Sequence, residues 1–296
     1  MTPDLVAAMD RAAMRVEAAL DALLPLPAGP ERRVFEAMRY ASLGGGKRLR
    51  PFLVQESGAL FDAPAETMLR VGAALEMVHC YSLVHDDLPA MDDDDLRRGK
   101  PTVHRAFDEA TAILAGDGLL TRAFEVIADP ATHPDGGVRS ALVVALARAA
   151  GPEGMVGGQM IDLAAEHRTA EIGAIIRLQR LKTGALIHFS CVAGAIMGHA
   201  PPALRDALGF YAQDFGLAFQ MADDLLDAEG SAETVGKAVG KDAGRGKATF
   251  VSLLGIDRAR EQTRHLAAQA AAHLGPFGAN AARLSDLASW VVARRH

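Results

Sequence analysis

The sequence predicts an all-α protein, a single large helical bundle around a central cavity. Half of the 296 residues are hydrophobic but only 5% are aromatic, and Ala and Leu dominate. This composition favours helices over sheets. No segment alternates apolar and polar residues with a period of two between hairpin turns. No long Ser/Gly-rich linker divides the chain, so residues 1–296 are expected to form one helical domain.

Glycine and proline residues divide the chain into helices. Residues 4–24 have helical spacing of apolar side chains, and a second helix is expected at residues 30–43. Further breaks are expected at Ala63-Pro64, Pro89, Gly116, residues 130–137, Gly151-Pro152, Gly157-Gly158, Pro201-Pro202 and residues 236–246. The apolar stretch from Gly184 to Ala200 contains His188 and is too short for a membrane span, so it is predicted to be a core helix.

Charge and cysteine usage exclude several classes of protein. The net charge is −6, and no long basic run is present, so nucleic-acid binding is not expected. Cys80 and Cys191 lie in apolar stretches without metal-ligand spacing, which indicates two buried, reduced thiols. The charged N-terminal residues do not resemble a signal peptide. A cytoplasmic location is the default expectation.

Two acidic clusters each follow an apolar stretch. The first runs from His85 to Asp95 and contains Asp86-Asp87 and Asp92-Asp93-Asp94-Asp95. The second runs from Phe219 to Asp227 and contains Asp223-Asp224. This internal similarity suggests that two helices deliver carboxylates to two walls of one cavity.

The spacing of these carboxylates favours a metal site. Asp223 and Asp227 share one helix face, whereas Asp86 and Asp92 can approach each other only if the chain turns back at Pro89. Uncompensated charge at the end of an apolar helix is costly, and hard divalent cations remove that cost. The predicted magnesium ligands are Asp86, Asp87, Asp92, Asp223, Asp224 and Asp227. The remaining aspartates of the first cluster fit an ordinary solvated surface.

Basic residues lie beside both clusters. A glycine turn leads into Lys47-Arg48-Leu49-Arg50, and Arg97-Arg98 follow the first cluster directly. Glycine lets backbone amides approach an anion, and arginine can bind phosphate through two hydrogen bonds. The predicted phosphate-binding residues are Gly46, Lys47, Arg50, Arg97, Arg98, Lys182, Lys237 and Lys247. Any one of these lysines could equally be solvated. His79, two helical turns before Asp86, is either a further phosphate ligand or a core residue.

Together these residues resemble the trans-prenyl diphosphate synthase family, in particular its bacterial farnesyl diphosphate synthase (geranyltranstransferase) members. Seven blocks occur in the family's order from about residue 30 onward. They are Gly46-Lys47-x-x-Arg50-Pro51, Asp86-Asp87-x-x-x-x-Asp92, Gly158-Gln159-x-x-Asp162-Leu163, Lys182-Thr183-Gly184, Phe219-Gln220, Asp223-Asp224-x-x-Asp227 and Gly240-Lys241-Asp242. The resemblance implies an isoprenoid-synthase bundle. It also implies a magnesium-dependent enzyme that joins isopentenyl diphosphate to dimethylallyl or geranyl diphosphate, forming farnesyl diphosphate and releasing diphosphate.

The resemblance also implies a role for each matching residue. Asp86, Asp92 and Asp223 would hold magnesium on the allylic diphosphate, assisted by Asp87 and Asp227. Arg97, Lys182 and Lys237 would contact that diphosphate, and Lys47, Arg50, His79 and Arg98 would bind isopentenyl diphosphate. Thr183 and Gln220 would line the reacting end, so the catalytic candidates are Lys182, Thr183, Gln220 and Arg97. No side-chain base is implied, because the released diphosphate can take the proton.

Product length is expected to depend on Tyr81 and Ser82. A side chain five positions before Asp86 lies about 7.5 Å further down a helix. In the family, an aromatic residue there blocks the tunnel and is typical of a fifteen-carbon product. The alternatives are ordinary core packing of Tyr81 and a geranylgeranyl diphosphate synthase, whose residue at this position is often smaller.

Three other functions compete with this interpretation. A class I terpene cyclase would be expected to carry an Asn/Ser/Glu-type second motif, and a non-catalytic synthase subunit tends to lose its metal-binding aspartates. A generic acidic metal-binding protein would leave the basic blocks unexplained. The family usually forms homodimers, which is the expectation here. Arg294-Arg295 could fold toward the diphosphate site, but a solvated tail is the preferred interpretation.

Overall fold

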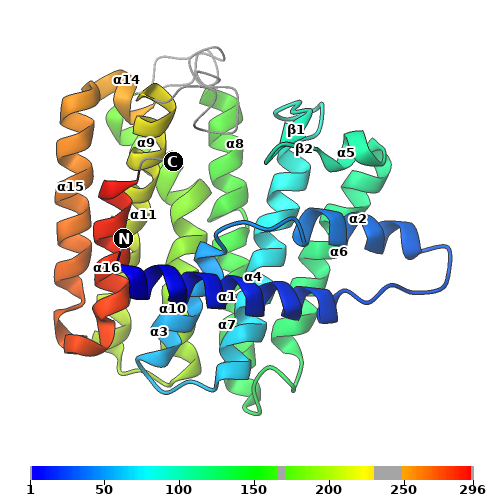
Figure 1. Cartoon of the computed structure of the whole chain (residues 1–296), viewed down its shortest axis with the longest axis horizontal. Coiled ribbons are helices and arrows are strands. Elements are labelled where there is room, and N and C mark those ends of the chain that lie inside the picture. Colours follow the sequence, from blue (N-terminus) through cyan, green and yellow to red (C-terminus); the bar gives the residue numbers. More distant parts are fainter. Residues whose placement is uncertain (1, 166–170, 230–248, 295–296) are drawn as a thin grey trace.

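A computed structural model of the chain describes residues 2–165, 171–229 and 249–294, and Figure 1 shows these as a bundle of helices. The elements are α1 (Pro3–Leu23), α2 (Arg32–Ser42), α3 (Leu49–Ala59), α4 (Ala65–Asp86), β1 (Leu96–Arg97), β2 (Lys100–Pro101), α5 (Val103–Ala106), α6 (Glu109–Ala128), α7 (Gly136–Ala150), α8 (Met155–Ala165), α9 (Ile172–Gln179), the π-helix η1 (Arg180–Gly184), α10 (Ala185–Met197), α11 (Pro202–Glu229), α14 (Phe250–Leu254), α15 (Ile256–His273), the 3₁₀-helix η2 (Gly275–Ala281) and α16 (Ala282–Ala293). The all-α prediction is confirmed.

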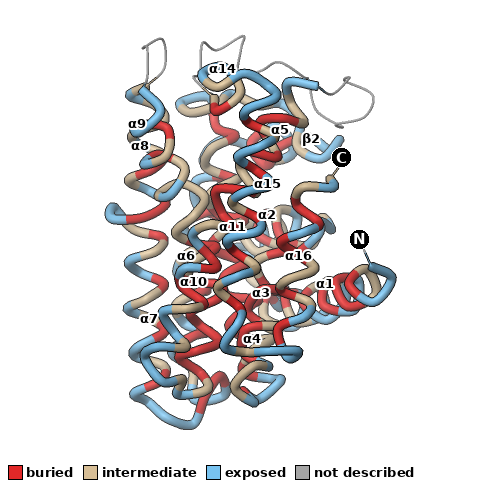
Figure 2. Tube along the Cα trace, turned by 90° about the vertical axis from the view of Figure 1, so that its left-hand side faces the viewer, coloured by how far each residue is buried: buried red, intermediate tan, exposed pale blue. Residues whose placement is uncertain are grey.

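The helices α4, α10 and α11 stand near the centre of the bundle, while α1 runs across it (Figure 1). Nearly every residue of α10 is buried, and α4 and α11 are buried along much of their length. Figure 2 shows the buried positions gathered along the inner sides of the helices. The predicted core helix within Gly184–Ala200 is therefore confirmed. Among the described residues, no helix is both long and apolar enough to cross a membrane.

Most helix ends follow the local sequence signals. Helix α4 begins directly after Pro64 and ends at Asp86, shortly before Pro89, while α11 starts with Pro202 in its first turn. Proline is tolerated there because the first helical amides have no partner within the helix. The side chains of Thr2 and Asp108 cap α1 and α6 by accepting backbone hydrogen bonds. These caps satisfy amides that the helices leave unpaired.

Two of the expected breaks are wrong. Gly116 lies inside α6, and Gly157-Gly158 lie inside α8. A Cβ atom on Gly116 would lie 2.1 Å from Nε2 of His85, and one on Gly158 would lie 2.2 Å from the backbone nitrogen of Lys182. These glycines permit close packing of helices rather than a turn. Local sequence alone does not distinguish the two uses.

The structure adds a short β-hairpin that the sequence analysis did not predict. Strands β1 and β2 pair antiparallel, with Arg97 opposite Lys100. The turn between them contains Arg98 and Gly99, both with positive φ. This hairpin directly follows the first acidic cluster and fixes the position of Arg97 relative to α4. Cys80 and Cys191 are buried free thiols, as predicted.

Candidate active site

A cavity of about 440 Å³ opens between α3, α4, α8 and η1. It is large enough for a small organic ligand. Seven residues predicted from the sequence line it: Arg50, His79, Tyr81, Ser82, Asp86, Lys182 and Thr183. Three separate segments of the chain therefore contribute to the cavity. They supply predicted phosphate-binding cations, a predicted metal-binding carboxylate and the residues predicted to set product length.

The first acidic cluster folds back on the end of α4. The backbone amide of Asp92 donates to the carbonyl oxygen of Asp86 at 2.8 Å, and that of Asp93 donates to Leu88 at 3.1 Å. This turn around Pro89 brings Asp92 beside Asp86, as the spacing predicted. Burial, and secondarily the charges of Asp92 and Asp87, raise the pKa of Asp86 to about 6, although Lys182 acts in the opposite direction. Asp86 is thus a carboxylate that a bound cation would stabilise.

Asp87 faces a different partner from its neighbour Asp86. Asp87 is buried, and Nε of Arg97 donates to its two carboxylate oxygens at 2.9 and 2.8 Å. This two-point contact anchors the β-hairpin to the end of α4. The structure therefore places Arg97 beside Asp87, close to the cavity but outside its lining.

Helix α11 carries the second acidic cluster and is joined to η1 by a side-chain hydrogen bond. Thr183 Oγ1 donates to Oε1 of Gln220 at 3.3 Å, and Nε2 of Gln220 donates to Asp224 at 3.1 Å. The other oxygen of buried Asp224 accepts the backbone amide of Phe250 at 2.9 Å. Asp224 thus orients Gln220 and holds the start of α14, whereas Asp227 is half-buried near the end of α11.

Asp223 and Asp86 belong to the same region. Burial lowers the pKa of Arg50, while the carboxylates of Glu76 and Asp223 act in the opposite direction. Asp223 therefore lies within electrostatic range of a residue that lines the cavity together with Asp86. The hydrogen bond between Thr183 and Gln220 connects η1, which lines the cavity, to α11. That the two acidic clusters face each other across one cleft stays a prediction.

The basic residues after the glycine turn point in different directions. Arg48 is buried, and its guanidinium donates to Glu76 at 2.8 Å. Arg50 lines the cavity, and Lys47 lies 5.2 Å from the ring centre of Trp290. Burial, followed by the charge of Arg294, lowers the pKa of Lys47.

The glycine turn is held by the arginine at the tip of the β-hairpin. Arg98 Nη1 donates to the carbonyl oxygen of Gly45 at 2.6 Å. Gly46 has a φ of 121°, and a Cβ atom there would lie 2.7 Å from the Arg98 guanidinium. Only glycine allows both this backbone conformation and this approach. The loop with Gly46 and the arginine pair are therefore neighbours in space.

His79 is a neutral cavity residue. Burial, followed by the positive charges of Arg50, Arg98, Arg97 and Arg48, lowers its pKa well below the ordinary value. It lines the cavity, so the structure favours an uncharged imidazole that can exchange hydrogen bonds with a ligand.

Two further residues, Asp162 and Gln159, belong to the site without having been assigned a role. Lys182 Nζ lies 2.7 Å from a carboxylate oxygen of Asp162. Gln159 lines the cavity, and neither polar atom of its buried amide has a partner among the described residues. The sequence analysis placed both residues in a family block but assigned neither a function.

Arg294 was expected to lie in a solvated C-terminal tail, and this expectation is wrong. Its side chain is only 10% exposed, and Nη1 lies 2.8 Å from Asp223, an ion pair by distance that lacks hydrogen-bond geometry. Its guanidinium also lies 4.5 Å from the ring centre of Phe219. Arg294 is therefore packed against the second acidic cluster and is not solvated. Lys237 and Lys247 lie outside the described residues.

No three His, Cys, Asp or Glu side chains among the described residues form a ready-made metal cage. Magnesium is usually held by one or two carboxylates together with substrate phosphates. Asp86 at the end of α4, Asp92 in the turn after it and Asp223 on α11 carry the hard oxygen atoms that magnesium prefers. The donor set fits magnesium bound together with a diphosphate.

Comparisons with known proteins agree with this geometry. The polyprenyl synthetase family model matches residues 31–275. The farnesyl diphosphate synthase of Geobacillus stearothermophilus is 44% identical over 95% of each chain. The farnesyl diphosphate synthase of Escherichia coli is 45% identical over 88% of this chain and 89% of its own. The crystal structure of an FPP/GFPP synthase from Zymomonas mobilis has a TM-score of 0.90 and 51% identity, covering 99% of this chain and 100% of that one.

Proposed function

Because this chain belongs to the polyprenyl synthetase family, we propose that it is a magnesium-dependent trans-prenyltransferase that makes farnesyl diphosphate. It joins isopentenyl diphosphate head-to-tail to dimethylallyl diphosphate and then to geranyl diphosphate, releasing diphosphate each time. The observation that carries the proposal is the cavity lined by Asp86, Lys182 and Thr183, together with Arg50, on which Asp223 acts electrostatically. The farnesyl diphosphate synthases named above support the choice of product.

The first task of the site is to bind and activate the allylic diphosphate. Asp86, Asp92 and Asp223 would hold magnesium ions shared with its oxygens, with Asp87 and Asp227 assisting. The ions neutralise the charge that develops on the leaving group. Lys182 and Arg97 add positive charge on the same side, which is most effective as the carbon–oxygen bond breaks. Asp162 and Asp87 hold these two cations in place.

The second task is to protect the allylic cation from water. Apolar side chains, among them Met155, Met160 and Leu163, line the cavity together with Tyr81. An allylic chain packed against them would displace water that could otherwise capture the cation. The oxygens of Thr183 and Gln220, which share a hydrogen bond, would stabilise positive charge at the reacting end. Asp224 acts here by orienting Gln220, in addition to its expected place in the second metal motif.

The third task is to deliver isopentenyl diphosphate. Arg50 and Arg98 act electrostatically on the neutral His79, and Lys47 and the Gly46 loop would add further contacts to the diphosphate. Guanidinium groups bind diphosphate oxygens through paired hydrogen bonds. The double bond of this substrate attacks the allylic carbon, and the released diphosphate then accepts the proton that leaves. Lys237 and Lys247 would add further positive charge near the diphosphates.

Product length would be set at Tyr81 and Ser82. Tyr81 is buried within the cavity lining, one turn below His85, with which it makes an edge-to-face contact at 5.7 Å. A ring in this position limits the depth available to the growing chain. A geranylgeranyl product is the second candidate and would require a deeper tunnel than the Tyr81 ring allows.

The chain is further proposed to act as one cytoplasmic domain, residues 1–296, that forms a homodimer. Large apolar side chains are exposed on adjacent helices, namely Ile113 and Leu114 on α6 and Val144 on α7. Burying such residues in a subunit interface is favourable. Light scattering of the purified protein would test the dimer directly.

One assay tests the proposed activity. The purified protein is incubated with isopentenyl diphosphate, one allylic diphosphate and magnesium, and the products are dephosphorylated and identified by chromatography. A fifteen-carbon product that requires magnesium supports the proposal. A cyclic hydrocarbon would support a terpene cyclase, and no product with any starter would support a non-catalytic subunit.

A further inference from the structure

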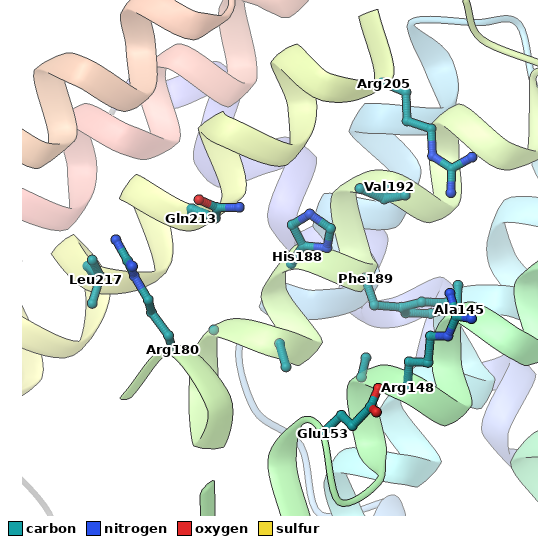
Figure 3. Close-up of a pocket in the computed structure, with 13 residues that line it drawn as sticks. Ala145, Arg148, Glu153, Arg180, His188, Phe189, Val192, Arg205, Gln213 and Leu217 are labelled. Atoms are coloured by element: carbon teal, nitrogen blue, oxygen red, sulfur yellow. The ribbon is translucent and has the colours of Figure 1, made fainter. Parts of the chain in front are cut away.

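A second hollow lies outside the catalytic cavity. It has a volume of about 450 Å³ and is formed by α7, the segment before α8, η1, α10 and α11. Figure 3 shows its side chains, with His188 near the middle and arginines on different sides. None of its lining residues lines the catalytic cavity. The volume falls within the range typical of small-molecule sites.

The hollow is strongly cationic. Arg148 comes from α7, Arg180 from η1 and Arg205 from α11, and Glu153 is the one carboxylate in the lining. None of the three guanidinium groups forms an ion pair with a residue that the structure describes. A single exposed arginine is ordinarily solvated. Three arginines from three elements around one hollow, in a chain of net charge −6, indicate a place where an anion is stabilised.

The base of the hollow is apolar. Phe189 and Val192 of α10 and Leu217 of α11 line it and are buried, and Ala145 of α7 lies beside them. A free inorganic anion would leave this surface without a partner. A ligand with an apolar group attached to its anionic end would cover both parts of the lining.

His188 contributes a neutral polar group between these two parts. Burial, followed by the charge of Arg205, lowers the pKa of His188, so its imidazole is uncharged near pH 7. The hollow therefore presents guanidinium groups at its edge, one neutral imidazole and an aliphatic and aromatic base. It contains no cluster of carboxylates that would share a magnesium ion with a ligand.

The two cavities lie on different sides of the same π-helix. Arg180 and Gly184 of η1 line the second hollow, whereas Lys182 and Thr183 line the catalytic cavity. The wider turn of a π-helix is frequently associated with functional sites. A ligand in the second hollow would contact this element without entering the catalytic cavity.

We propose that this second hollow binds a small phosphate monoester with a compact apolar group, independently of the prenyl transfer reaction. Phosphate suits the arginines because guanidinium groups can bind it through paired hydrogen bonds. The apolar group would lie over Phe189, Val192 and Leu217. Recognition thus requires both ends of the ligand.

Calorimetric titration of the full-length protein with phenyl phosphate tests this proposal. The titration is run with and without magnesium and inorganic diphosphate, which bind in the catalytic cavity, and the variants below assign the binding to the second hollow. Parallel titrations with inorganic phosphate and with phenol measure the binding of the anionic half and of the apolar half of the ligand separately. We expect phenyl phosphate to bind more tightly than either half. No binding of phenyl phosphate, or equal binding of inorganic phosphate, would overturn the proposal.

Two pairs of variants locate the binding. Arg205→Glu reverses a charge in the hollow, and Arg177→Glu makes the same change on α9, outside it. Ala145→Trp fills the hollow, whereas Ala147→Trp adds the same ring at an exposed position of α7. We expect Arg205→Glu and Ala145→Trp to weaken binding about tenfold or more, while their controls bind like the wild type. Equal weakening in a control, or unchanged binding in Arg205→Glu, contradicts the assigned site; circular dichroism confirms that each variant is folded.

Discussion

The backbone amide of Asp92 donates to the carbonyl oxygen of Asp86 at 2.8 Å. This hydrogen bond closes the turn at the end of α4 and makes two carboxylates six positions apart into neighbours. A straight helix would have placed them on different faces. The longer spacing of this motif is therefore compatible with shared metal binding, and the turn containing Pro89 provides the geometry.

Replacing the carboxylate of Asp86 or of Asp223 should abolish most of the activity. We expect Asp86→Asn and Asp223→Asn each to lower kcat/KM by about 100-fold or more, because each removes charge that holds magnesium on the leaving group. Initial rates at increasing magnesium concentrations measure this. Asp93→Asn is the matched control, since Asp93 is exposed and its positive φ is one that Asn tolerates. Near-normal rates in Asp86→Asn at saturating magnesium would contradict the metal assignment.

Enlarging the space at Tyr81 should lengthen the product. Tyr81→Ala removes a buried ring from the lining of the catalytic cavity, so longer prenyl chains can enter. Reversed-phase chromatography of the dephosphorylated products would then show chains beyond fifteen carbons. Tyr81→Phe keeps the ring and should keep the wild-type product. If Tyr81→Ala makes the same product as the wild type, Tyr81 is not the floor of the tunnel.

Asp162 should act through Lys182. The two side chains form an ion pair at 2.7 Å, and Asp162 is 13% exposed. We expect Asp162→Asn to lower kcat and raise KM for the allylic diphosphate, while KM for isopentenyl diphosphate stays nearly constant. A double-mutant cycle with Lys182→Ala should show that the two effects are not additive. Additive effects would show that Asp162 works independently of Lys182.

Two neighbouring arginines should have opposite mutant phenotypes. Arg48 is 1% exposed and donates to Glu76, so Arg48→Ala leaves a buried carboxylate without its partner. We expect a loss of about 3–5 kcal/mol in the free energy of unfolding. Arg50→Ala should instead raise KM for isopentenyl diphosphate with a smaller change in stability. Urea unfolding and steady-state kinetics on both variants check this, and reversed phenotypes would refute the assignment.

His79 should make the protein less stable in mild acid. Its pKa is lowered in the folded state, so below pH 6.5 the unfolded chain binds more protons and unfolding becomes more favourable. This stability is present above pH 6.5 and is lost as the pH falls. Between pH 7.5 and 5.5 the free energy of unfolding should therefore fall, and His79 should account for part of that fall. Urea unfolding at both pH values should show a smaller pH dependence in His79→Gln; an unchanged dependence would mean that His79 protonates freely in the folded protein.

Local signals in the sequence were sufficient for much of the fold. Proline positions and apolar spacing placed the starts of α4 and α11 and the buried helix α10. The acidic and basic motifs indicated a site, and the structure places Asp86, Arg50 and Lys182 in the lining of one cavity. These features depend on backbone propensity and on the cost of unpaired charge, which a short stretch of sequence already contains.

Local signals failed where a residue's role depends on a distant partner. Gly116 and Gly158 looked like helix breaks, but each lies within a helix and allows another segment to approach closely. Arg294 looked like part of a solvated tail, but it pairs with Asp223. In each case the partner is far away in the sequence, so local composition contains no sign of the contact.

The sequence by itself determined the fold class, the family and the chemistry of the catalytic groups, because residue types and spacings specify helices, carboxylates and cations. Only the tertiary structure decided which groups face the cavity. It turned Arg48 inward toward Glu76 and left Arg50 in the cavity, and it paired Lys182 with Asp162. The physical reason is that side-chain direction and charge pairing follow from the packing of whole helices, and this packing is set by contacts across the bundle.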